Sequence, residues 1–107
     1  MIGDIPKYGR HSHTACEYKN KVLIFGGEER WNPTLNYREC LNDTRSFDPA
    51  KNEWKALRCL GGIDPRRNHA AAVVEKTMFV YGGINNQGTY LKDVWALNLS
   101  KKYELNI

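Results

Sequence analysis

The sequence predicts an all-β fold, in which two four-stranded antiparallel blades form part of a β-propeller without completing its ring. A chain of 107 residues suits one small domain. The stretch that ends in Gly26-Gly27 recurs 56 residues later, where it ends in Gly82-Gly83. Short apolar runs rich in β-branched and aromatic residues alternate with turn-forming residues, and no helical period persists. A repeat of about 50 residues built from four strands is typical of a propeller blade.

The two repeats align without a gap before the glycine pairs, and the matched positions are Arg10 with Arg66, His13 with His69, and Ala15 with Ala71. After the glycines, residues 41–43 (Leu-Asn-Asp) correspond to residues 91–93 (Leu-Lys-Asp) at an offset of 50. The six-residue difference falls between the glycine pair and the leucine. It therefore predicts an insertion in a loop, where extra length costs little free energy.

These matches divide the chain into a lead-in over residues 1–9, a first repeat over 10–63 and a second over 64–107. The first repeat predicts strands near 12–18, 22–27, 42–48 and 53–58. The second predicts strands near 69–75, 78–83, 93–99 and 102–106. Residues 19–21 and 48–52 are predicted as tight turns.

The ordered motif within each repeat resembles the kelch repeat. It consists of Arg-x-x-His-x-Ala, an apolar strand that ends in Gly-Gly, a Leu-x-Asp that opens the next strand, and a Trp eleven residues after that Asp. The residues that carry it are Arg10, His13, Gly26, Gly27, Asp43 and Trp54, then Arg66, His69, Gly82, Gly83 and Asp93. The second repeat has Tyr103 where the pattern expects Trp. The resemblance covers residues 6 to 105 and implies a kelch-type propeller.

Blade packing explains the choice of residues without the family name. The second strand of each repeat is continuously apolar, which predicts burial on both faces between stacked blades. The small residues of the first strand, such as those at 70–72, suit the crowded innermost position of a blade. The glycine pairs predict positive φ angles and a close approach of another backbone.

The sequence predicts neither a catalytic nor a metal site, and no cofactor. His13 and His69 recur at matched positions, so we expect them to be hydrogen-bonded structural residues rather than ligands. The three cysteines lie 24 and 19 residues apart, without the close pairs of a zinc site or an even disulfide set.

Composition excludes several classes of partner. The net charge of +4 is spread along the chain in short pairs, whereas phosphate binding needs a continuous basic face, so we expect no nucleic acid. No apolar run approaches the ~20 residues of a membrane span, and the N-terminus has no secretion signal. The sequence therefore predicts a cytoplasmic setting.

The expected function is that of a non-enzymatic protein-interaction module, a scaffold or substrate adaptor, as the kelch resemblance implies. Antiparallel geometry puts the loops between second and third strands, and those between repeats, on one edge of the blades. The expected partner-binding residues on that rim are Ser12, Glu28, Arg30, Trp31, Tyr37, Arg67, Asn68, Asn85 and Asn86.

An alternative is an enzyme similar to galactose oxidase or a sugar isomerase, or a glycan-binding propeller. Stacked repeats generally need at least three units to bury a continuous core. We therefore also expect either that further blades lie outside this chain, which would then be a fragment, or that the chain self-associates.

Overall fold

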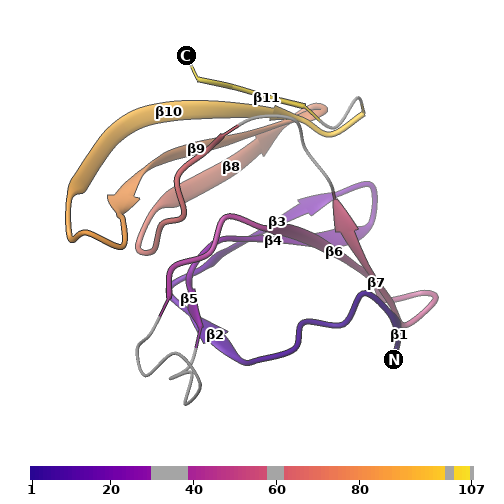
Figure 1. Cartoon of the computed structure of the whole chain (residues 1–107). Helices are drawn as coiled ribbons and strands as arrows, with labels where there is room; N and C mark the ends of the chain where they lie inside the picture. Colours follow the sequence, from indigo (N-terminus) through magenta and orange to yellow (C-terminus); the bar gives the residue numbers. More distant parts are fainter. Residues whose placement is uncertain (30–38, 58–61, 101–102, 107) are drawn as a thin grey trace.

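The computed structural model describes residues 1–29, 39–57, 62–100 and 103–106, which form strands and connecting turns. Two antiparallel sheets lie face to face, and we call them sheet 1 and sheet 2 (Figure 1). Within these residues all regular structure is β, so the predicted fold class is confirmed. No helix in the described part of the chain is long and apolar enough to cross a membrane.

Sheet 1 has the strand order β1-β7-β6-β4-β3. Four of its strands are the ones that the first repeat predicts, namely β3 (Thr14–Tyr18), β4 (Lys21–Phe25), β6 (Thr44–Asp48) and β7 (Glu53–Leu57). The fifth, β1 (Ile2–Gly3), pairs in parallel with β7. The turn between β3 and β4 has positive φ at Lys19 and Asn20, as tight hairpins require.

Sheet 2 has the order β11-β10-β9-β8 and contains the four strands of the second repeat. They are β8 (Ala70–Val74), β9 (Thr77–Ile84), β10 (Tyr90–Asn98) and β11 (Tyr103–Asn106). Strands β9 and β10 are longer than predicted because they stay paired past the glycine pair, with an irregular register between Leu91 and Val94. A short two-stranded sheet, β2 (Arg10–His11) with β5 (Glu28–Glu29), was not predicted.

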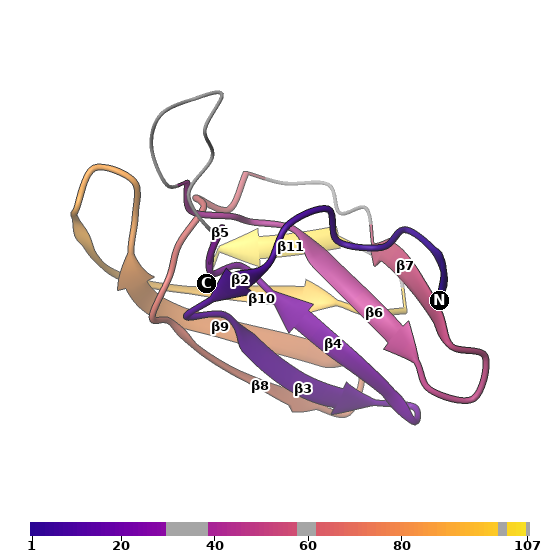
Figure 2. The ribbon, with the colours of Figure 1, turned by 90° about the horizontal axis from the view of Figure 1, so that it is seen from below.

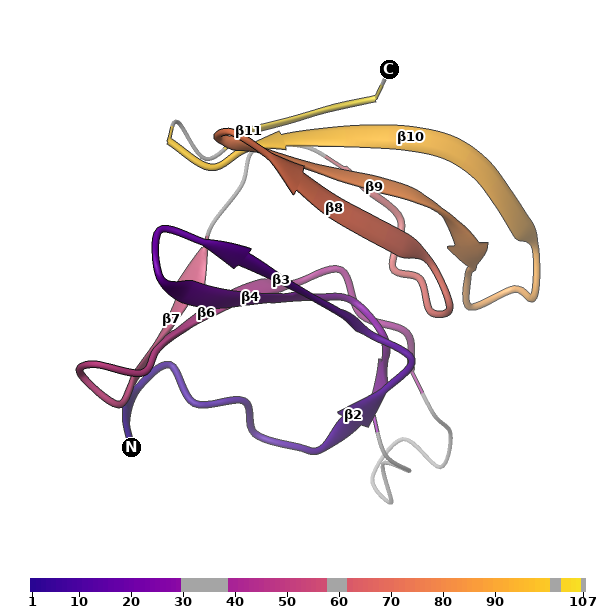
Figure 3. The ribbon, with the colours of Figure 1, turned by 180° about the vertical axis from the view of Figure 1, so that it is seen from behind.

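The core lies between the two sheets. Leu23 and Phe25 of β4 face Met78 and Val80 of β9, and all four side chains are at most 2% exposed. Ile63, on the connection between the sheets, closes the same cluster. Strands β3 and β8 lie next to each other, as expected for the innermost strand of each unit (Figures 1 and 3).

The expectation that β4 and β9 are buried on both faces is wrong. Alternate residues of each strand point away from the facing sheet, and of these Val22 is 39% and Tyr81 55% exposed. On β8 the outward Val74 is 60% exposed. The physical reason is that each sheet has one neighbour among the described residues, so its second face meets solvent.

The segment before β3 crosses the face of sheet 1 that points away from sheet 2 (Figures 1 and 3). It is anchored at one end by the β1–β7 pairing and at the other by the β2–β5 pairing, as the view from below also shows (Figure 2). Its apolar side chains remain largely in solvent, with Ile2 59% and Ile5 45% exposed.

Candidate functional site

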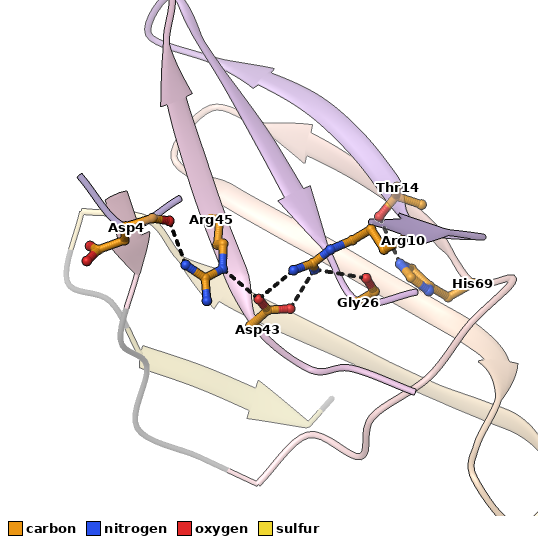
Figure 4. Close-up of polar contacts among 7 residues, drawn as sticks. All are labelled: Asp4, Arg10, Thr14, Gly26, Asp43, Arg45 and His69. Atoms are coloured by element: carbon orange, nitrogen blue, oxygen red, sulfur yellow. Dashed lines mark hydrogen bonds and ion pairs between the residues drawn. The ribbon is translucent and has the colours of Figure 1, made fainter. Parts of the chain in front are cut away.

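The repeated arginine and aspartate form the same ion pair in both repeats. In sheet 1 the Arg10 guanidinium donates to both carboxylate oxygens of Asp43, at 2.7 and 2.9 Å, and to the carbonyl oxygen of Gly26 at 3.2 Å (Figure 4). Arg45 donates to the same carboxylate and to the Asp4 carbonyl oxygen. Burial works to raise the pKa of Asp43, but hydrogen bonds from the two arginines lower it overall.

In sheet 2 the guanidinium of Arg66 donates to both oxygens of Asp93 at 2.7 and 2.9 Å, and to the Gly82 carbonyl oxygen at 2.9 Å. The arginine is fully buried. The indole of Trp95 donates to the same carboxylate at 2.7 Å. The Arg66 hydrogen bonds hold the pKa of Asp93 at about 2. A buried guanidinium is tolerated because it is paired and forked.

The two signature histidines differ in environment. His69 is 8% exposed, its Nε2 lies 2.8 Å from the Thr14 hydroxyl of sheet 1, and its ring meets Phe25 edge-on (Figure 4). Burial and the Arg66 charge lower the pKa of His69 to about 4, so the ring is neutral near pH 7. His13 is exposed, and none of the described residues hydrogen-bonds to its side chain.

The glycine pairs allow the chain to turn where the backbones crowd together. All four residues have positive φ. A Cβ on Gly27 would lie 2.6 Å from the His11 carbonyl oxygen, and one on Gly83 would lie 2.6 Å from the Arg67 carbonyl oxygen. The Gly27 amide also donates to the Arg66 carbonyl oxygen at 2.8 Å, which ties the two repeats together.

The predicted rim joins segments of both repeats. Arg67 Nε and a Glu28 carboxylate oxygen form an ion pair at 3.0 Å, with the arginine side chain 30% exposed. The exposed Asn68 donates from its backbone amide to the carbonyl oxygen of Ser12 at 3.0 Å, and both residues have positive φ. These four residues, far apart in sequence, therefore lie on adjoining segments.

The second rim cluster involves the loop after β9. The side-chain oxygen of Asn86 accepts a hydrogen bond from the Cys40 amide at 2.8 Å. Asn85 caps its own loop by accepting from the amides of Gln87 and Thr89. Burial raises the pKa of the Cys40 thiol.

Three predicted rim residues, Arg30, Trp31 and Tyr37, lie outside the described residues, and so does the side chain of Tyr103. Trp54 of the signature packs against Phe47, with ring centroids 5.1 Å apart. The second ligands of the ion pairs, Arg45 and Trp95, were missed by the sequence reasoning. The available signal was their position two residues after each repeated aspartate.

The largest hollow between the sheets lies at the opposite edge, beside the short turns. It encloses about 680 Å³ and is lined by residues that include Tyr18, Lys19, Val73, Lys76 and Ser100. Among the described residues, no group of three or more His, Cys, Asp or Glu side chains is placed to hold a metal ion.

The ion pairs, glycine turns and sheet order define a repeat protein of the β-propeller class. A family model described as the KLHDC2/KLHL20/DRC7 Kelch-repeats domain matches residues 1–104. The chain therefore belongs to the kelch-repeat family.

Several relatives carry this sequence inside longer chains. An F-box/kelch-repeat protein of Arabidopsis thaliana is 36% identical over 105 residues, covering 89% of this chain and 20% of the relative. A tRNA wybutosine-synthesizing protein 2/3/4 of rice (Oryza sativa subsp. japonica) is 34% identical, covering 74% of this chain and 7% of the relative. The chain thus spans a fifth or less of these relatives.

The solved structure of YjhT superposes on this chain with a TM-score of 0.80 at 16% identity. The match covers 94% of this chain and 38% of that one. This similarity establishes the kelch-propeller fold.

Proposed function

We propose that this chain is a non-enzymatic protein-binding module, a scaffold or substrate adaptor, that holds its partner on the rim defined above. The observation that carries the proposal is the inter-repeat linkage at that rim. The Glu28–Arg67 ion pair and the Ser12–Asn68 hydrogen bond fix segments 56 residues apart relative to one another. A binding surface that is already ordered loses less conformational entropy when a partner docks.

The chemistry of the rim favours a polar partner segment. Asn68 and Asn86 are exposed, and Arg67 retains part of its guanidinium surface. Asparagine amides both donate and accept hydrogen bonds, while arginine donates in a planar fork that matches carboxylates. An extended peptide with a carboxylate side chain would satisfy these groups.

The test is to recover the partner by crosslinking from cells and to compare affinities of purified variants. Arg67→Ala and Trp31→Ala are expected to weaken binding by about tenfold or more, as truncation of interface hot spots does. Lys51→Ala, on the turn at the opposite edge, is the control and should bind as the parent does.

A further variant separates the rim from the hollow at the other edge. Lys76 lines that hollow and is exposed. Loss of affinity in Lys76→Ala, together with unchanged affinity in Arg67→Ala, would move the partner to the hollow and refute the rim proposal.

A further inference from the structure

The outward face of sheet 2 is a continuous apolar surface. Cross-strand pairing puts Tyr81 beside Ala70 and Val94, and Phe79 beside Ala72 and Ala96, all on the side opposite Met78 and Val80. Val74 extends the same face at the end of β8 and is 60% exposed. Among the described residues no segment covers this face.

The internal repeat shows what kind of surface packs on this face. At the offset of 56 residues, Phe79 and Tyr81 correspond to Leu23 and Phe25, which sheet 1 presents to sheet 2. Those two side chains are covered by Met78 and Val80, and Phe25 also meets the ring of His69. The outward face of sheet 2 is therefore a second example of a face whose covering is known.

It is also more apolar than its counterpart. Thr44 and Ser46 lie beside Phe25 and Leu23 in sheet 1, whereas the corresponding positions of sheet 2 are Val94 and Ala96. Burial of this face would gain more hydrophobic free energy than burial of its counterpart does, since no hydroxyl group has to be desolvated.

The surface that would fit lies on the far side of sheet 1. Val22 and Ile24 correspond to Met78 and Val80, and Val22 is 39% exposed. Ala15 of the same face is exposed, and it corresponds to Ala71, which packs against the core. The chain thus presents the two complementary halves of its own inter-sheet interface at opposite ends.

Two further features match this interface. His13 corresponds to His69, yet no described residue hydrogen-bonds to its side chain. Ile2 and Ile5 of the crossing segment are 59% and 45% exposed. The connection that holds the corresponding place between the sheets instead buries Ile63 in the core.

We propose that the chain associates head to tail with a second copy of itself, the outward face of sheet 2 packing on the Val22 face of sheet 1 in the next copy. Val22 and Ile24 would then cover Phe79 and Tyr81, and His13 would meet Tyr81 edge-on as His69 meets Phe25. Because the two faces differ, the contact is heterologous and can repeat from copy to copy. The proposal is independent of the rim, which lies at an edge of the sheets.

The test uses sedimentation velocity over a range of concentrations. The parent chain should form dimers and larger species, while Tyr81→Glu and Val22→Lys should each sediment as monomers because each blocks one half of the contact. Lys51→Glu, on an exposed turn, carries the same new side chain as Tyr81→Glu and should associate as the parent does. Circular dichroism would establish that each variant keeps its sheets, and Val74→Lys replaces any variant that does not.

Mixing the two blocked variants gives the decisive measurement. The Tyr81→Glu chain retains an intact Val22 face and the Val22→Lys chain an intact Tyr81 face, so the mixture should form a 1:1 dimer and nothing larger. Three results would overturn the proposal. The parent chain could stay monomeric at its solubility limit, Val22→Lys alone could dimerise, which indicates pairing of identical faces, or the mixture could stay monomeric.

Discussion

The imidazole of His69 meets the ring of Phe25 nearly at a right angle, with centroids 5.2 Å apart and an interplanar angle of 85°. This contact joins the signature histidine of the second repeat to the apolar strand of the first. The same histidine approaches the Thr14 hydroxyl. One repeat therefore supplies the residue that orders its neighbour, which explains why a motif within one unit acts between units.

The buried ion pair gives the first prediction. Arg66→Lys should lower the free energy of unfolding by roughly 2–4 kcal/mol, because an ammonium group cannot reproduce the forked contacts to Asp93 and the Gly82 carbonyl. Arg67→Lys is the matched control. Its side chain is 30% exposed and should cost no more than about 1 kcal/mol. Urea denaturation measures both, and equal losses would contradict the assignment.

The second prediction concerns pH. His69 is neutral in the folded protein, with its pKa lowered to about 4 from 6.5, so the unfolded chain binds more protons between these values. Stability contributed by this residue is complete above pH 6.5 and falls as the pH decreases toward 4. His69→Gln should flatten that part of the curve and lower the melting temperature at pH 7. His11→Gln, at an exposed position, should leave the slope in place; a parent curve without the slope would refute the prediction.

Asp93 gives a separate effect at lower pH. Its pKa is lowered to about 2 from 3.8 by Arg66, so its contribution is present above pH 3.8 and is lost as the pH falls toward 2. Asp93→Asn should remove this acid-sensitive step and destabilise the protein at pH 7. Thermal melts between pH 2 and pH 5 would measure it, and an unchanged acid limb would argue against the pairing.

A glycine series separates backbone strain from steric clash. Gly9→Ala should be nearly neutral, since nothing lies within 4 Å of the added Cβ. Gly88→Ala meets no atom either but has a φ of 77°, so it should cost about 1 kcal/mol. Gly83→Ala combines a φ of 97° with a 2.6 Å approach to a carbonyl oxygen, and should cost clearly more. Chemical denaturation should rank the three in this order.

The histidines also predict metal content. His69 already lies within hydrogen-bond distance of Thr14 and is buried, so chain purified without chelators should hold no stoichiometric copper, iron or zinc. Elemental analysis measures this directly. About one metal ion per chain would overturn the structural role assigned to these residues.

Most of the architecture could be predicted from local patterns. Alternating apolar runs and turn residues located the eight strands of the two repeats because strand pairing follows sequence neighbours in an antiparallel meander. The repeated Arg, His, Gly-Gly and Asp positions identified the family because the same contacts recur in each unit. Short pairings such as β1 with β7 left no such pattern, since two residues carry no periodicity.

What the sequence by itself determined is the repeat, its strands and the residues that recur. Only the tertiary structure decided which face of each sheet is covered and which partner each recurring residue meets. Val22 and Met78 are equivalent in the alignment, yet Val22 is 39% and Met78 1% exposed. Burial depends on whether a second sheet lies above a strand, and the strand's own sequence does not record that neighbour.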